Sequence, residues 1–417
     1  MNGQTPRSMR LHIGIFGRRN VGKSSVLNAL TGQQVAIVSD VAGTTTDPVE
    51  KAMELLPVGP VVFVDTAGVD DIGALGQQRI AATYKVFERT ELALLVAAAG
   101  EWGGFEEQLL AELSGREIPT LVVFNKTDLA GPEPELAARL EKRALAVAAL
   151  STRTGDGVDA LRQAIKDAVP AEFASPPAIA ADLLPPGGVA VLVVPIDKEA
   201  PKGRLILPQV QVIRDLLDAD CTCLVTKERE LRDAFRRLAA PPDLVVTDSQ
   251  AFLKVAADTP DGVRMTSFSI LFARLKGDLV EMARGAAAID RLRPGDRILI
   301  AEACTHHAIG DDIGRVKIPR WLEQYAGGAL QADVRSGRDF PEDLSVYKLV
   351  IHCGACTWNR RQMIYRIQRC RRAGVPVTNY GIAIAHTLGI IRRALAPFPA
   401  ALDAYLDALA DGGGRKS

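Results

Sequence analysis

The segment Gly17-Arg-Arg-Asn-Val-Gly-Lys-Ser24 constrains the fold of this 417-residue chain more than any other. It matches G-x-x-x-x-G-K-[ST] and lies between the strand-like run Leu11–Phe16 and the helix-like run Ser25–Leu30. Glycines at such a junction let backbone N–H groups surround phosphates at a helix N-terminus, where the dipole favours negative charge. Lys23 supplies charge to the β- and γ-phosphates, and the Ser24 hydroxyl is a hard ligand for Mg²⁺. The pattern predicts a nucleoside-triphosphate site in an α/β domain.

Two later segments predict the γ-phosphate side of this site. The apolar run Val61–Val64 ends in Asp65-Thr-Ala-Gly68. An aspartate at the carboxyl end of a strand can hold the hydration shell of Mg²⁺, and the Gly68 N–H can meet the γ-phosphate. The threonine-rich segment 39–48 stands where a P-loop GTPase carries the switch threonine that reaches Mg²⁺.

The base is predicted by two motifs that follow further strands. The run Thr120–Phe124 ends in Asn125-Lys-Thr-Asp128, and Ala146–Leu150 leads to Ser151-Thr152. A carboxylate at Asp128 can accept both N–H donors of the guanine edge, a pair that adenine lacks. Motifs in this order, each at the carboxyl end of a strand, predict a GTPase. The predicted GTP contacts are Gly17, Asn20, Val21, Gly22, Lys23, Ser24, Ser25, Asn125, Lys126, Asp128, Ser151 and Thr152, and the predicted catalytic group is Lys23, Thr45, Asp65 and Gly68.

Residues 10–173 resemble the translation-factor-type GTPases, most closely the branch that includes the tRNA-modification GTPase. In that branch an asparagine at the place of Asn20 and a loop like Gly43-Thr-Thr45 bind a monovalent cation, usually K⁺. The resemblance implies K⁺ ligands at Asn20, Ser39, Val41 and Thr44, and Mg²⁺ ligands at Ser24 and Thr45. Such a cation would take the place of an arginine finger beside the β- and γ-phosphates. Two residues depart from the branch: Ser39 replaces a threonine, and Thr46 an arginine.

Length and charge bound the rest of the chain. A length of 417 residues predicts about three domains. Fifty basic and fifty acidic side chains cancel, which disfavours nucleic acid and anionic membranes as partners. Because no run of 18 apolar residues occurs, we expect no membrane span and a cytoplasmic protein.

The middle region, residues 176–281, begins at a proline-rich linker. Strand-like runs at Val189–Val194, Cys221–Thr226 and Leu244–Thr247 alternate with helical patterns, which predicts a small α/β domain. It shows no catalytic constellation. We therefore expect this domain to mediate dimerisation.

Residues 282–411 predict a third small α/β domain with a cysteine site. The strand-like runs Arg297–Ala301 and Tyr347–His352 are followed by Cys304-Thr-His306-His307 and by Cys353-Gly-Ala-Cys356. Ligands collect at the carboxyl ends of parallel strands, so these thiols are expected to meet. In a cytosolic chain they indicate a metal or redox centre rather than disulfides. By spacing alone a structural zinc ion and an iron–sulfur cluster fit equally well.

The order of GTPase domain, site-poor domain, Cys-x-His and His-Cys-x-x-Cys resembles the [FeFe]-hydrogenase maturation GTPase family (HydF) over nearly the whole chain. The resemblance implies a homodimer and a [4Fe–4S] cluster on Cys304, Cys353 and Cys356, with His352 or His306 as a possible fourth ligand. It also implies a scaffold that carries a two-iron precursor to the hydrogenase, with the radical maturation enzymes as further partners. The alternative is a GTP-driven regulator of RNA or ribosome assembly with a structural zinc site.

Overall fold

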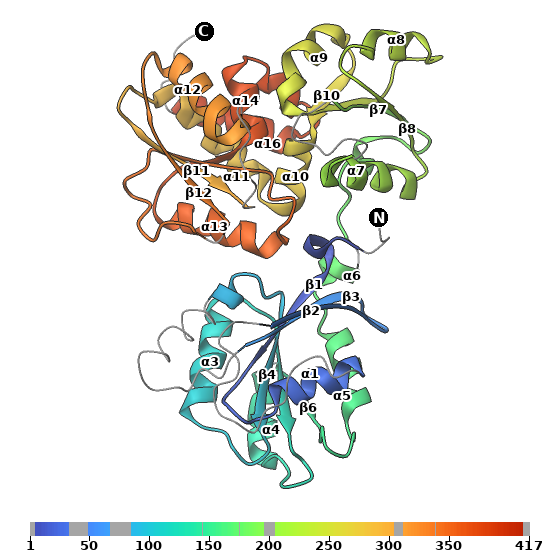
Figure 1. Ribbon diagram of the computed structural model, residues 1–417, viewed down its shortest axis with the longest axis vertical. Coiled ribbons are helices and arrows are strands. Elements are labelled where there is room, and N and C mark those ends of the chain that lie inside the picture. Colours follow the sequence, from blue (N-terminus) through green and yellow to red (C-terminus); the bar gives the residue numbers. More distant parts are fainter. Residues whose placement is uncertain are drawn as a thin grey trace. The chain divides into compact units, whose positions relative to one another are not determined.

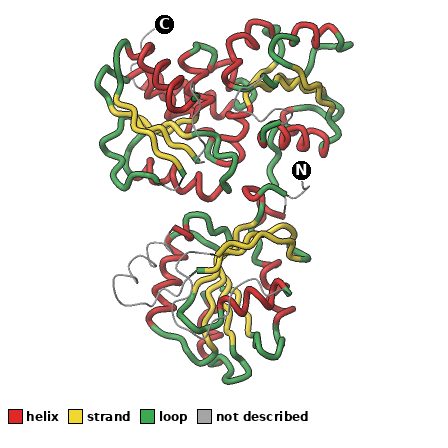
Figure 2. Tube along the Cα trace, viewed as in Figure 1, coloured by secondary structure: helices red, strands yellow, loops and turns green. Residues whose placement is uncertain are grey.

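The computed structural model describes residues 5–32, 49–66, 85–143, 145–174, 176–195, 205–303, 312–337 and 339–411. The chain folds into two compact units, Met1–Pro176 and Pro177–Ser417, so the boundary falls in the predicted linker. Both units are α/β, as the sequence predicts (Figures 1 and 2). The second unit contains both of the smaller α/β domains predicted from the sequence.

The first unit is built on one six-stranded sheet. Its strands are β1 (Leu11–Phe16), β2 (Val49–Leu55), β3 (Gly59–Asp65), β4 (Leu92–Ala98), β5 (Thr120–Asn125) and β6 (Ala146–Ala149). The order is β2-β3-β1-β4-β5-β6, with β2 antiparallel to β3 and every other pair parallel. The helices are α1 (Lys23–Thr31), α3 (Gly104–Gly115), α4 (Pro134–Lys142), α5 (Val158–Asp167) and α6 (Ala171–Ala174).

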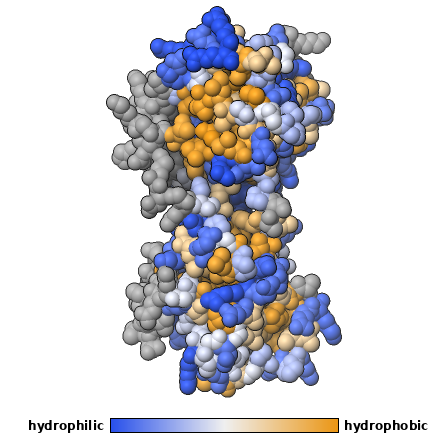
Figure 3. All heavy atoms as spheres, turned by 90° about the vertical axis from the view of Figure 1, so that its right-hand side faces the viewer, coloured by the Kyte–Doolittle hydropathy of each residue, from blue (hydrophilic) through white to orange (hydrophobic). Residues whose placement is uncertain are grey.

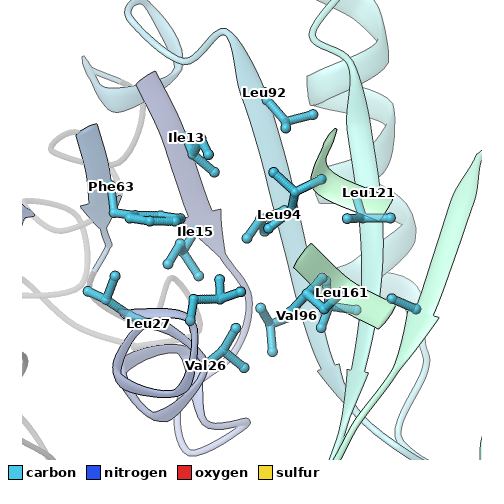
Figure 4. Packing of buried hydrophobic residues seen from close by; sticks show 14 of the residues in the cluster. Ile13, Ile15, Val26, Leu27, Phe63, Leu92, Leu94, Val96, Leu121 and Leu161 are labelled. Carbon is cyan, nitrogen blue, oxygen red and sulfur yellow. The ribbon is translucent and has the colours of Figure 1, made fainter. Parts of the chain in front are cut away.

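Both faces of this sheet are buried, which is why its parallel strands are apolar without alternation. On one face Ile13, Ile15 and Leu94 pack against α1 and α5 through residues such as Leu27 and Leu161 (Figure 4). On the other face side chains of β1, β3, β4 and β5 pack against α3 and α4. The carboxyl ends of the parallel strands are thereby fixed at one edge, where the predicted GTP motifs lie.

The second unit holds two four-stranded, wholly parallel sheets. The first has the order β10-β9-β7-β8, and the second β12-β11-β13-β14. The strands of the first are β7 (Val189–Val193), β8 (Thr222–Thr226), β9 (Leu244–Thr247) and β10 (Arg264–Ser267), and its helices are α7 (Leu207–Asp218), α8 (Leu231–Arg236), α9 (Phe252–Asp258) and α10 (Phe268–Lys276).

The strands of the second sheet are β11 (Arg297–Glu302), β12 (Gln331–Ser336), β13 (Leu349–His352) and β14 (Val377–Asn379). Its helices are α11 (Leu279–Ala286), α12 (Ile318–Ala326), α13 (Arg360–Arg372), α14 (Tyr380–Thr387), α15 (Ile391–Leu395) and α16 (Pro399–Asp411). Figure 1 shows α13 on one side of the sheet and α12, α14 and α16 on the other. Gly389, which adopts a left-handed φ of 72°, lies between α14 and α15 and separates the two helices.

A buried polar seam joins the two sheets of this unit. The Asn379 side chain, at the end of β14, donates to the carbonyl and the hydroxyl of Ser269 in α10 at 2.8 and 2.9 Å. The Gly381 N–H donates to the same hydroxyl at 3.1 Å. A Cβ at Gly381 would lie 2.8 Å from Ser269 Cβ, so α10 and α14 can approach this closely only at a glycine. The two predicted small domains therefore form one packed body.

In the part of the chain that the structure describes, no helix combines the length and apolarity needed to cross a bilayer.

Candidate functional site

The P-loop joins β1 to α1 in a shape that two glycines permit. Gly17 has φ of 146°, and Gly22, the N-cap of α1, has φ of 93°. A Cβ at Gly17 would lie 2.1 Å from the Val96 carbonyl oxygen, and one at Gly22 would lie 2.2 Å from Asn125 Nδ2. At neither position is there room for a side chain, so both require glycine. The loop thereby leads the chain into the N-terminus of α1, where anions are favoured.

Lys23 and Ser24 occupy the first turn of α1 next to Asp65. Lys23 is buried, and its ammonium group donates to the carbonyls of Gly17 and Arg18 at 3.0 and 2.7 Å. The Ser24 hydroxyl donates to Asp65 Oδ2 at 2.7 Å. Burial raises the pKa of Asp65, against the opposing effects of the Ser24 hydrogen bond and the Lys23 charge. Asp65 Oδ1 is buried and accepts no hydrogen bond from the described residues. An oxygen left in this way fits the hydration shell of a Mg²⁺ ion.

The predicted base-binding residues meet where β5 and β6 end. Asn125 is 1% exposed; its amide donates to the Val21 carbonyl at 2.9 Å and accepts from the Thr152 N–H at 3.2 Å. Asn125 thus ties the P-loop to the second base-binding loop. Asp128 Oδ1 accepts from the Ser151 hydroxyl at 2.7 Å, and this bond is the main cause of the lowered pKa of Asp128. The carboxylate is therefore ionised at neutral pH, as recognition of guanine requires.

An ion pair between the P-loop and α3 was not predicted from the sequence. The Arg18 guanidinium donates to both carboxylate oxygens of Glu106 at 2.6 and 2.9 Å, and Glu106 is wholly buried near the start of α3. Arg18 also lies over the Phe105 ring, 5.0 Å from its centroid. A bidentate, buried pair of this kind fixes geometry strongly. It anchors the phosphate-binding loop to α3.

Part of the predicted GTPase site lies outside the described residues. These positions are Ser39, Val41, Thr44, Thr45 and Gly68. Of the K⁺ ligands implied by the resemblance, Asn20 is described: it is exposed and has a left-handed φ of 59°. The predicted contacts Ser25 and Lys126 lie in α1 and directly after β5.

The cysteine motif lies at the carboxyl edge of the second sheet of unit two. β11 and β13 pair in parallel with Ala301 opposite His352, so Cys353 follows the end of one strand beside the end of the other. The Ala303 N–H donates to Cys353 Sγ at 3.1 Å. Ala355 has a left-handed φ of 48°, which turns the chain tightly between Cys353 and Cys356. Both cysteines are half-buried.

His352 is 1% exposed and has partners at both ring nitrogens. Nδ1 lies 2.9 Å from the Cys353 carbonyl oxygen, and Nε2 lies 3.0 Å from Nη1 of Arg366. Burial, with the Arg366 charge as the second cause, lowers the pKa of His352 to about 3. The ring is neutral at physiological pH. Ligation by His352, which the resemblance allows, would require one of these hydrogen bonds to break.

The buried side chain of Glu302 makes polar contacts at the end of β11. It accepts from Arg315 Nη2 at 2.9 Å and from the Ser336 hydroxyl at 2.7 Å. The Gly337 N–H donates to the Glu302 carbonyl at 3.0 Å. β11 and the end of β12 are thus joined by side chains as well as by the sheet.

Cys304, His306 and His307 lie outside the described residues. Within the described ranges no three His, Cys, Asp or Glu side chains form a group that could hold a metal ion. The remaining cysteines are consistent with packing roles: Cys370 is fully buried in α13 with its pKa raised by burial to about 12, and burial also raises the pKa of Cys223.

Three family models match successive parts of the chain. A model described as 50S ribosome-binding GTPase matches residues 12–126, the hydrogen maturase F dimerization domain matches residues 179–277, and the hydrogen maturase F tetramerization domain matches residues 280–397. The motifs and these matches define a P-loop GTPase that carries two further domains of types named for self-association.

Relatives with curated descriptions match the first unit. The tRNA modification GTPase MnmE of Chromobacterium violaceum is 40% identical over 153 residues, which are 36% of this chain and 33% of that protein. MnmE of Thiobacillus denitrificans is 41% identical over 157 residues, 36% of this chain and 32% of that protein. The chain therefore spans about a third of the length of these relatives. Among solved structures, Era of Aquifex aeolicus bound to GDP·AlF4⁻ covers 87% of this chain and 98% of its own at 18% identity and a TM-score of 0.35, a likeness too low to carry an argument.

Because both domains that follow the GTPase domain match hydrogen maturase F models, the chain belongs to the hydrogen maturase F (HydF) family.

Proposed function

We propose that this GTPase is an iron–sulfur scaffold that assembles a two-iron precursor and delivers it to [FeFe]-hydrogenase, in concert with the radical maturation enzymes. The proposal rests on one observation above all: the hydrogen bond from Ala303 N–H to Cys353 Sγ at 3.1 Å. It brings the residue before Cys304 into contact with the second cysteine motif, at the sheet edge where ligands of α/β proteins collect. Hydrogen bonds from backbone N–H groups to cysteine sulfurs also help to set the reduction potential of iron–sulfur clusters.

The residues present fit a [4Fe–4S] cluster better than a purely structural role. Cys304, Cys353 and Cys356 would supply three thiolates, and His306 or His352 is the candidate fourth ligand. Three thiolates leave one iron with an exchangeable ligand position. When bound, the cluster would offer this position to an incoming precursor. Cys353 and Cys356 are half-buried rather than fully buried, which favours such access over a closed structural site.

Anaerobic reconstitution with iron and sulfide, followed by EPR after reduction, tests the scaffold. We expect a cluster signal in the wild type and in Cys370→Ser, whose thiol is buried away from the motif, and its loss in Cys304→Ser and Cys353→Ser. A wild-type protein without a cluster signal would overturn the proposal. One tightly bound zinc ion without iron would favour a GTP-driven regulator of RNA or ribosome assembly, which the 50S ribosome-binding description of the first model suggests. The balanced charge of the chain argues against that reading.

For hydrolysis we propose that GTP binds with Mg²⁺ and is activated by K⁺. The backbone N–H groups of the P-loop and Lys23 would hold the phosphates, and Ser24 with Thr45 would bind Mg²⁺ while Asp65 holds its hydration shell. A K⁺ ion at Asn20, Ser39, Val41 and Thr44 would neutralise charge that develops between the β- and γ-phosphates.

Two measurements test this site. Lys23→Ala should abolish GTP turnover, because the developing charge loses its partner; wild-type turnover in this variant would contradict the assignment. Exchange of K⁺ for Na⁺ at equal ionic strength should lower kcat. Equal rates in the two salts would remove the argument from Asn20.

We further propose that a second copy of the chain binds along β8. This strand ends its sheet, and Val225 in β8 and Val210 and Leu217 in the neighbouring α7 are 43, 43 and 53% exposed. Figure 3 shows an apolar area on the surface of unit two on the side that carries these elements. An exposed apolar edge strand pairs readily with another strand. The dimerization-domain match over residues 179–277 supports the same surface.

Light scattering after size exclusion tests the dimer. Val225→Lys combined with Leu217→Glu should yield monomers or weaker dimers, whereas Leu129→Glu, at a 72% exposed leucine of the first unit, should leave the mass unchanged. Unchanged dimers in the double variant would reject this surface.

The charge balance and the partners proposed above fit a cytoplasmic protein that binds neither nucleic acid nor membrane.

A further inference from the structure

Both nitrogens of the His352 ring are occupied by groups whose chemistry is fixed. An arginine guanidinium carries donors only, so Arg366 Nη1, 3.0 Å from Nε2, can do nothing but donate to it. Nε2 is therefore the unprotonated, accepting nitrogen. The ring proton then sits on Nδ1 and is donated to the Cys353 carbonyl at 2.9 Å. In this arrangement neither nitrogen has a lone pair free for a metal ion.

Arg366 is itself held from several sides. It is 4% exposed, and its Nη2 donates to the Gly337 carbonyl at 2.6 Å. The guanidinium carbon lies 4.2 Å from the centroid of the Trp358 ring and 4.4 Å from that of Phe340. A planar guanidinium that stacks on aromatic faces is a geometry that arginine, and not lysine, can adopt. The donor to His352 is thus a fixed part of the structure rather than a surface side chain.

The position of Arg366 links three strand ends of the cysteine site. Through His352 it contacts the end of β13, directly before Cys353. Through Gly337 it contacts the residue after β12, whose N–H is bonded to the last residue of β11, Glu302. Loss of Arg366 would release the His352 ring and loosen the edge that carries the thiols.

We propose that Arg366 is a positioning residue that keeps His352 off the iron–sulfur cluster, so that the iron not bound by cysteine takes a ligand other than His352. This inference rests on the proposed scaffold function, because it concerns the fourth iron of that cluster. Of the two histidines considered as the fourth cluster ligand, the inference excludes His352. The fourth ligand is then His306 or an exchangeable ligand from outside the chain. His352 then serves to hold the Cys353 carbonyl, and through it the motif, in place.

The first test needs no cluster. In apoprotein labelled with ¹⁵N-histidine, long-range ¹H–¹⁵N correlation spectra report which ring nitrogen carries the proton, and His352→Gln assigns the signal among the five histidines. We expect the Nδ1–H tautomer for His352 in the wild type and in Arg369→Met. Arg369 is the matched control: it lies in the same helix and against the same Phe340 ring, but it donates to the carbonyls of Pro341 and Glu342. Arg366→Met should lose the fixed tautomer.

The second test uses the reconstituted, reduced protein. We expect the hyperfine (HYSCORE) spectrum of the wild-type cluster to be unchanged by His352→Gln. In Arg366→Met we expect a new histidine nitrogen coupling that disappears in the double variant Arg366→Met/His352→Gln. A wild-type coupling that disappears in His352→Gln would overturn the inference, as would identical spectra for Arg366→Met and Arg369→Met in both tests.

The two tests separate this inference from the scaffold proposal. If no cluster forms in the wild type, the scaffold proposal fails, while the tautomer of the apoprotein still decides whether Arg366 holds His352. If Arg366→Met does not fold, the wild type and His352→Gln alone decide the assignment, because a cluster coupling from His352 is either present or absent in that pair.

Discussion

Replacement of Asn125 by alanine should destabilise the first unit measurably, although the side chain is small. Its amide makes two hydrogen bonds, to the Val21 carbonyl at 2.9 Å and from the Thr152 N–H at 3.2 Å, in an interior where Asn125 is 1% exposed. Each such bond contributes about 1 kcal/mol net, and the groups left unpaired add to the cost. We expect a loss of about 2–3 kcal/mol in the free energy of unfolding. Because the P-loop and the base loop lose their link, GDP affinity should fall as well.

Asn125→Asp is the sharper variant of this pair. It has the same shape and keeps the acceptor for Thr152, but an ionised carboxylate would face the Val21 carbonyl, so the loss should equal or exceed that of Asn125→Ala. Trp102 provides the assay: it is the one tryptophan of residues 1–176, and its ring lies 5.8 Å from Phe124. In a Trp321→Phe/Trp358→Phe background its fluorescence reports the urea unfolding of the first unit. If Asn125→Asp unfolds at the wild-type urea concentration, the link between the two loops contributes nothing and the reasoning is refuted.

Three further results are expected. Gly22→Ala, which forces a Cβ to 2.2 Å from Asn125 Nδ2 at a left-handed φ, should weaken fluorescent GDP binding by about a hundredfold, corresponding to about 3 kcal/mol, while Gly104→Ala, which meets open space, should leave it unchanged. Arg18→Met, which leaves the buried Glu106 carboxylate with the Gly103 N–H as a partner but without a counter-charge from Arg18, should cost the first unit about 3 kcal/mol in urea unfolding, against about 0.5 kcal/mol or less for Arg139→Met at the exposed pair with Glu107; a loss for Arg18→Met as small as that for Arg139→Met would show that the first pair is unimportant. Burial lowers the pKa of His386 below its ordinary 6.5, so the unfolded state binds the proton first and the stability of the second unit should fall as the pH drops below about 6.5; His386→Gln should reduce this slope in thermal melts, and an unchanged slope would contradict the assignment.

Strands with a continuous apolar run could be predicted from sequence, including the edge strands β6 and β8, whereas the polar or short edge strands β2, β10 and β12 could not. β1 and β5 are apolar runs and lie where the sequence analysis predicts strands. β2, with the sequence VEKAMEL, and β12, with the sequence QADVRS, lie at sheet edges with half-exposed side chains, so neither shows an apolar run. β10 has four residues, too few for a periodic signal. The pairing that makes these segments strands comes from their neighbours in space.

The residues proposed to bind GTP could be named from the sequence because their motifs specify residue types at fixed spacing. The buried Arg18–Glu106 pair and Arg366 beside the cysteines have no such motif. A weaker signal was present for both. Glu106 stands on the apolar stripe of α3 with Leu109, Leu110 and Leu113. Arg366 stands on the buried stripe of α13 with Met363, Ile367 and Cys370. A charged residue at a position where the helical period demands an apolar one indicates a fixed partner in the interior. The partner's identity, Arg18 in one case and His352 in the other, requires the fold.

The polar seam of Ser269, Asn379 and Gly381 limits where the chain can be cut into fragments that fold. The match to one family model ends at residue 277 and the match to the next begins at residue 280. Nevertheless α10, before this boundary, packs closely against α14, after it. A fragment that starts near residue 280 would leave the Asn379 amide without Ser269 and bare the surface that α10 covers. The cysteine module can therefore be excised or transplanted intact only together with its neighbour, by a cut at Pro176–Pro177.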